Sequence, residues 1–95
     1  MHPKAAVVGL GVSGRAAAEL LYEDGYAVTA FDQSTTAVPE SLRECLTSVV
    51  TIADPVTLAE AICALGPAVV VLSPGVPETS PIAAIPRQRG IDVIG

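Results

Sequence analysis

The fold of this chain is decided by the stretch Val7-Val8-Gly9-Leu10-Gly11-Val12-Ser13-Gly14-Arg15, in which glycines separate an apolar run from an alanine-rich run. The spacing is G-x-G-x-x-G. Gly9 suits a tight turn, Gly11 removes a side chain that would block a pyrophosphate, and Gly14 lets a helix pack closely on a strand. A helix that begins here aims free N–H groups and the positive end of its dipole at the same anion. The stretch therefore predicts a diphosphate-binding turn, without saying which nucleotide carries the diphosphate.

The composition excludes several classes of protein. The chain has 95 residues, of which 51% are hydrophobic and 16% charged, so residues 1–95 are expected to form one domain with a real core. The net charge is −5, and there are one Phe, two Tyr and no Trp, so the chain lacks the basic face and the stacking aromatics of nucleic-acid binders. The apolar runs are interrupted by Gly and Pro and fall short of the roughly 20 residues that span a bilayer. We expect neither nucleic acid nor membrane as a partner.

The N-terminus and the cysteines indicate the compartment. Met1-His2-Pro3-Lys4 leads directly into a short apolar run, without the longer apolar region and cleavage site of a signal peptide, which predicts a cytoplasmic protein. Cys45 and Cys63 have no metal-ligand spacing, and we expect both to be reduced, small apolar residues of helices. No metal site is expected.

Strand-like and helix-like segments alternate along the chain. Strands are expected over residues 5–8, 27–31 with Asp32 at the end, 49–52, 69–72 and 91–94, and helices over 13–23, 39–46, 55–65 and from 81 onward. Asp54-Pro55 and Ser80-Pro81 each combine a helix N-cap with proline at the first helical position, whereas Pro86 predicts a kink or an early break. Five β-α repeats with right-handed crossovers predict an α/β, Rossmann-like, doubly wound parallel sheet of order 3-2-1-4-5.

This order places two turns on either side of one crevice. The chain reverses direction between the first and fourth strands, so the glycine-rich turn should face Ser73-Pro74-Gly75-Val76-Pro77. Asp32 follows the second strand at the distance from the glycines that suits a hydrogen bond to a ribose hydroxyl, of adenosine or of uridine. Two simpler interpretations stay open: Asp32 caps the polar turn that it begins, and the glycines serve only close packing. These residues alone favour an NAD(P)-binding module.

A further set of motifs changes that balance. The Ser73-Pro74-Gly75 turn, the Ser80-Pro81 helix start and the terminal Gly90-Ile91-Asp92-Val93-Ile94-Gly95, together with the glycine-rich turn, resemble the N-terminal domain of the Mur ligase family, most closely its D-glutamate-adding members. The resemblance covers essentially the whole chain, and it implies a UDP site in place of a dinucleotide site. It implies that the diphosphate is met by Gly11, Val12 and Ser13, the uridine by Asp32, Gln33 and Ser34, and the other side of the crevice by Ser73, Pro74 and Gly75. The chain departs from the family pattern after Asp32. Family members often carry a basic residue shortly after this Asp, whereas this chain has Gln33, Ser34 and Thr35.

The same resemblance implies what the chain does not do alone. The family joins D-glutamate to UDP-N-acetylmuramoyl-L-alanine with ATP and magnesium. This chain lacks a G-x-x-x-x-G-K-[ST] loop, and Lys4 and His2 are its only lysine and histidine. The ATP and magnesium sites are therefore expected in central and C-terminal domains after Gly95, with no catalytic residue and no cofactor here. Three hypotheses remain: a UDP-substrate-binding domain, an NAD(P)-binding domain of a dehydrogenase or transport regulator, and a structural module with an empty crevice.

Overall fold

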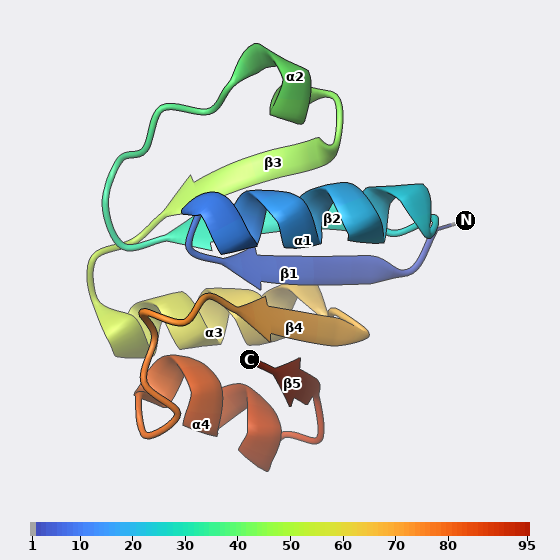
Figure 1. The fold of residues 1–95 in the computed structure, drawn as a ribbon. Coiled ribbons are helices and arrows are strands. Elements are labelled where there is room, and N and C mark those ends of the chain that lie inside the picture. The colour runs from blue at the N-terminus through green and yellow to red at the C-terminus, as the bar shows by residue number, and fades with distance from the viewer. Residues whose placement is uncertain (1) are drawn as a thin grey trace.

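The computed structural model describes residues 2–95 and contains a five-stranded sheet in the order β3-β2-β1-β4-β5, with every neighbouring pair parallel (Figure 1). The strands are β1 (Lys4–Val8), β2 (Ala27–Asp32), β3 (Leu46–Thr51), β4 (Val69–Leu72) and β5 (Asp92–Ile94). The helices are α1 (Val12–Glu23), α2 (Glu40–Arg43), α3 (Pro55–Leu65) and α4 (Pro81–Gln88). This topology confirms the predicted Rossmann-like α/β fold.

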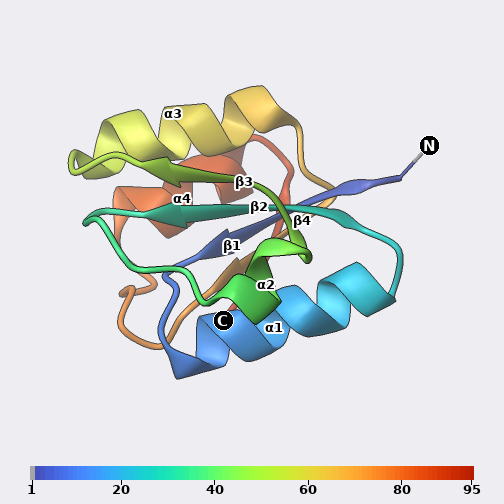
Figure 2. The same ribbon diagram turned by 90° about the horizontal axis from the view of Figure 1, so that it is seen from above.

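Helices cover both faces of the sheet (Figure 2). Successive residues of the central strand β1 point to opposite faces, so Ala6 and Val8 join the core under α3 and α4, while Val7 joins the core under α1 and α2. On the first side Leu58 and Ile62 of α3 are fully buried. A strand that is buried on both faces reads as a continuous apolar run, and this explains the opening Ala-Ala-Val-Val.

The predicted helix caps of α3 and α4 are confirmed. The carboxylate of Asp54 accepts hydrogen bonds from the backbone N–H of Thr57 at 2.8 Å and from its hydroxyl at 2.7 Å. The hydroxyl of Ser80 accepts a hydrogen bond from the backbone N–H of Ile82 at 3.2 Å. A proline follows each cap in the first turn. These short polar signals fix where the two helices begin.

Two of the expected boundaries are wrong. The helix expected over 39–46 is only the single turn α2, and Leu46 begins strand β3 instead of ending a helix, so Cys45 lies in the turn between them and not in a helix. The β-branched residues of the Leu46–Thr51 segment favour a strand and extend it toward the N-terminus. Helix α4 does not break early at Pro86 but continues to Gln88. The ring of Pro86 is buried in the core, so packing compensates for the one N–H that proline lacks.

Candidate functional site

Three loops meet at the carboxyl ends of β1, β2 and β4. The N–H of Gly9 donates to the carbonyl oxygen of Phe31 at 2.7 Å, and the N–H of Ser73 donates to the carbonyl oxygen of Val8 at 2.9 Å. The glycine-rich turn is thereby fixed between the loop after β2 and the loop after β4, on the side where α1 begins (Figure 1). These loops meet where the strand order predicts a ligand site, at the point where the order of strands reverses.

The three glycines of the turn have three different surroundings. Gly9 has φ +87°, and a Cβ added there would stand 2.5 Å from the hydroxyl oxygen of Ser73, so this glycine allows both the turn and the approach of the opposite loop. A Cβ on Gly14 would overlap the carbonyl oxygen of Gly9, so this glycine sets the closeness of α1 to the turn. A Cβ on Gly11 would meet no atom within 4 Å. Only Gly11 therefore faces open space, which is where a ligand can approach.

Helix α1 has Gly11 as its N-cap residue and therefore lacks a side-chain cap. The first residues of any helix have N–H groups without an intrahelical acceptor, and in α3 and α4 a side chain satisfies one of them. No side chain does so in α1, and no acidic residue lies in its first turn. Val12 is 88% exposed and Ser13 is exposed, so this end of the helix is accessible from solvent. Such an end, with its dipole, is suited to bind an anion.

Asp32 is half-buried and holds the glycine-rich turn to the loop after β2. Its Oδ2 accepts hydrogen bonds from the N–H of Leu10 and from the hydroxyl of Thr36, both at 3.1 Å, and its Oδ1 accepts one from the N–H of Ser34 at 3.2 Å. The carboxylate therefore caps its own turn, as the simpler interpretation expected, and also bonds the glycine-rich turn at Leu10. Because a carboxylate oxygen can accept more than one hydrogen bond, Oδ1 retains capacity for a ligand hydroxyl.

The other predicted site residues lie on the loops around this turn. The side-chain amide of Gln33 donates to the carbonyl oxygen of Ala53 at 2.8 Å, which ties Gln33 to the loop after β3. Ser34 is exposed, and so are Pro74 and Gly75 in the loop after β4. Ser73 is half-buried. Gly11, Val12 and Ser13 thus form the accessible start of α1. Ser73 lies against Gly9 of the same turn, and Gln33 is bonded to the loop after β3.

The sequence interpretation missed Arg15. Its Nε donates to the carbonyl oxygen of Leu10 at 3.1 Å, so the side chain folds back from the first turn of α1 onto the glycine-rich turn. The signal that could have found it is its position directly after the third glycine, in a chain with only five basic residues. Arg15 brings a positive charge to a site whose other predicted contacts are neutral or acidic.

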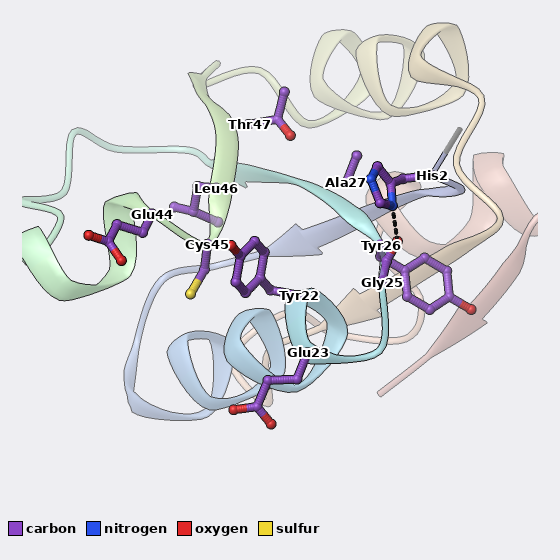
Figure 3. A pocket seen from close by; sticks show the side chains of 10 residues that line it. All are labelled: His2, Tyr22, Glu23, Gly25, Tyr26, Ala27, Glu44, Cys45, Leu46 and Thr47. Atoms are coloured by element: carbon purple, nitrogen blue, oxygen red, sulfur yellow. Dashed lines mark hydrogen bonds between the residues drawn. The ribbon is translucent and has the colours of Figure 1, made fainter.

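Two sizeable hollows lie away from the start of α1. One, of about 490 Å³, lies at the amino-terminal ends of β2 and β3, opposite the glycine-rich turn (Figure 3). It is lined by His2, Tyr22, Glu23, Gly25, Tyr26, Ala27, Glu44, Cys45, Leu46 and Thr47. Its rim carries two carboxylates and no Lys or Arg, so it is unsuited to a phosphate. The pKa of the Cys45 thiol is raised, first by loss of water and then by Glu19, Glu44 and Glu23, which keeps the thiol protonated and unreactive.

The second hollow, of about 440 Å³, lies between the loop after β2 and the edge strand β3. Its lining includes Thr35, Thr36, Ser48 and Val49, and its one basic residue is Arg43, whose Nε donates to the carbonyl oxygen of Val38 at 3.5 Å. It therefore borders the turn that Asp32 caps, on the side of β3.

Residues 2–95, the part of the chain that the structure describes, hold neither a metal-ligand cluster nor a membrane-spanning helix. No group of three or more His, Cys, Asp or Glu side chains in this range is placed to hold a metal ion. No helix in the same range has the length and apolar character to cross a bilayer. Cys45 and Cys63 are free thiols.

Comparisons with known proteins agree on one family. The family model described as "Mur ligase MurD-like, N-terminal domain" matches residues 3–95. Proteins named UDP-N-acetylmuramoylalanine--D-glutamate ligase from Synechocystis sp., Microcystis aeruginosa and Gloeothece citriformis are each 38% identical to the chain. The alignments cover 98%, 97% and 98% of the chain, but 21%, 20% and 21% of those relatives. The chain thus spans about a fifth of the length of the curated relatives that it matches.

Proposed function

We propose, from the premise that this chain belongs to the MurD-like N-terminal domains of Mur ligases, that it binds the UDP moiety of UDP-N-acetylmuramoyl-L-alanine. The observation that carries the proposal is the uncapped start of α1 at Gly11, which opens onto solvent beside two loops from other strands. The family relationship supplies the ligand, and the geometry supplies a surface that suits its diphosphate.

In this proposal the diphosphate binds at the first turn of α1. The backbone N–H groups of Val12 and Ser13 donate to phosphate oxygens, and the hydroxyl of Ser13 adds a third donor. Gly11 lets the phosphates approach, because no side chain occupies the space in front of it. Because this space is open, the turn does not have to rearrange when the phosphates bind.

The nucleoside lies toward Asp32, Gln33 and Ser34 in the same proposal. Support comes from Asp32 Oδ1, which accepts one hydrogen bond from residues 2–95, from the N–H of Ser34, and can accept another. Ser73, Pro74 and Gly75 form the other side of the site, and Ser73 lies against Gly9. The ligand is thus held between the loops after β2 and β4.

The whole protein's reaction belongs to the same proposal. The relatives named above are ligases that join D-glutamate to their substrate, and this chain matches only their N-terminal domain. We propose that the parent protein is such an ATP-dependent ligase, with ATP and magnesium bound by central and C-terminal domains. The role of the present domain is to hold the substrate by its nucleotide end, without a catalytic residue.

Nuclear magnetic resonance with the isolated chain tests the site. UDP should shift the amide signals of residues 9–14, 32 and 73–75, whereas NAD should leave them almost unchanged. NAD is the alternative worth including, because the glycine-rich turn with Asp32 also suits a dinucleotide. Shifts with NAD and none with UDP would overturn the proposal in favour of a dinucleotide-binding domain.

A substitution in the turn tests the diphosphate contact separately. Gly11→Val places a branched side chain where the phosphates approach, and Gly11 has φ −72°, so the backbone accepts the new residue without strain. UDP binding should disappear while the circular dichroism spectrum remains that of the folded domain. Ala16→Val, at an exposed position one turn further along α1, is the matched control and should bind UDP normally. Normal UDP affinity in folded Gly11→Val would contradict the proposed contact.

A further inference from the structure

We propose that Arg15 is a phosphate-binding residue of this site, with its guanidinium group directed to the diphosphate; this inference rests on the proposed UDP function. Arg15 lies in the first turn of α1, four residues after Gly11, and its side chain is half-buried. The bond from its Nε to the carbonyl oxygen of Leu10, at 3.1 Å, holds the guanidinium at the glycine-rich turn instead of letting it extend into solvent.

The backbone of Leu10 is held by two opposite charges. Asp32 accepts a hydrogen bond from the Leu10 N–H, and Arg15 donates one to the Leu10 carbonyl oxygen. Leu10 itself is only 2% exposed, so this anchor is part of the packed interior. The guanidinium therefore has a fixed attachment point in the turn, at the carbonyl group of Leu10.

Most of the donors of Arg15 remain available. A guanidinium has five N–H donors, and the Leu10 contact uses the one on Nε. Within residues 2–95, no carboxylate forms an ion pair with Arg15, whereas Arg87 pairs with Glu78 and Arg89 pairs with Glu60. The two terminal nitrogens present a planar set of donors that matches phosphate oxygens. In a chain of net charge −5, an arginine without a carboxylate partner at an uncapped helix start is suited to an anion.

Arg43 provides a matched comparison inside the same chain. Its Nε donates to the carbonyl oxygen of Val38, five residues earlier, just as Arg15 contacts Leu10 five residues earlier. Arg43 lies on α2, beside the hollow along β3 and not at the glycine-rich turn. Replacing either arginine removes the same charge and the same kind of backbone contact. A difference in UDP affinity between the two variants is therefore due to where the arginine lies.

The test is isothermal titration of the wild type, Arg15→Gln, Arg15→Lys and Arg43→Gln with UDP, UMP and uridine. Arg15→Gln should weaken UDP binding roughly ten- to a hundredfold, the range expected for charge-assisted hydrogen bonds, and leave uridine binding within about twofold. It should also reduce the salt dependence of UDP binding. Arg15→Lys should recover only part of the affinity, because lysine keeps the charge and loses the planar donors. Arg43→Gln should match the wild type with every ligand.

A measurement on the unaltered chain covers the case in which Arg15→Gln does not fold. The Nε–Hε resonance of Arg15 should shift on titration with UDP or inorganic pyrophosphate and stay in place with uridine. A wild type that binds UDP while Arg15→Gln binds it within twofold, or while the Arg15 resonance stays unchanged, overturns the role of Arg15 and leaves the proposed function intact. A wild type that binds no UDP overturns both.

Discussion

Replacing Gly14 with alanine should destabilise the domain through a single methyl group. The added Cβ would overlap the carbonyl oxygen of Gly9 and stand 3.0 Å from its carbonyl carbon and 3.6 Å from a methyl group of Val7. The turn cannot simply withdraw, because the N–H of Gly9 is bonded to Phe31 in the neighbouring strand. Either α1 must move away from the sheet, or the hydrogen bond between the turn and β2 must break.

Two opposing effects determine the magnitude. Alanine is favoured over glycine within a helix by about 1 kcal/mol, so Gly14→Ala would stabilise the domain if there were room. The added Cβ would lie well inside 3.0 Å of the carbonyl oxygen of Gly9, a separation that real Cβ atoms essentially never go below. Overpacking of this kind typically costs about 1–3 kcal/mol and occasionally more. Because the backbone oxygen is fixed, we expect the upper end of that range, and a net loss of about 2 kcal/mol or more. For a domain of this size, that loss lowers Tm by roughly 8–16 °C.

Urea denaturation followed by circular dichroism measures this loss directly, with Gly11→Ala as the control. Gly11 has φ −72° and no atom within 4 Å of an added Cβ, so its alanine variant should lose only about 1 kcal/mol as a poorer N-cap. If Gly14→Ala proved as stable as the wild type, or more stable, the reasoning that this glycine sets the distance between α1 and the turn would be refuted.

Three further predictions concern the turn, the carboxylate and a helix cap. Gly9→Ala should unfold the domain more readily, because its φ of +87° disfavours alanine and its Cβ would stand 2.5 Å from the hydroxyl oxygen of Ser73; an unchanged Tm would contradict this. Asp32→Asn should weaken UMP binding and leave pyrophosphate binding unchanged, and a UMP titration without loss would limit Asp32 to its structural hydrogen bonds. The pKa of Asp54 is held below its ordinary value of 3.8, first by the backbone N–H of Thr57 and then by its hydroxyl, so the ionised cap stabilises the domain above that pH and ceases to do so as the pH falls through the lowered pKa. The difference in unfolding free energy between the wild type and Asp54→Ala should therefore shrink between about pH 5 and pH 3, and a constant difference would exclude this explanation.

The fold could be predicted because its signals are local. Asp54-Pro55 and Ser80-Pro81 specify two helix starts by contacts within three residues, and the glycine spacing specifies the first turn. The extent of β3 was less clear, since the Leu46–Thr51 segment begins with a leucine that suits either a helix end or a strand start. The early break predicted at Pro86 is wrong for a related reason. Pro86 is buried by tertiary packing, which the local sequence pattern of a helix does not show.

The site was less predictable, because its geometry depends on residues distant in the sequence. The residue types at Gly11 and Ser13 indicate a phosphate, but the sequence does not show that Asp32 bonds the N–H of Leu10, 22 residues away. Nor does it show that Arg15 folds back to the carbonyl group of Leu10, since a helical arginine is ordinarily assigned to the solvated face. Both contacts require the closed fold, in which the loop after β2 and the first turn of α1 each reach the backbone of Leu10.

The missing cap of α1 also limits how stable the free domain can become. A serine or aspartate at Gly11 would complete the helix as Ser80 and Asp54 complete theirs, with a gain of roughly a few tenths of a kcal/mol. The same side chain would occupy the N–H groups that an incoming anion needs. The proposed ligand would instead act as the cap, so that part of the free energy of binding is the free energy of finishing a helix. A substitution at this position that raises the stability of the ligand-free domain would then lower its affinity for the ligand.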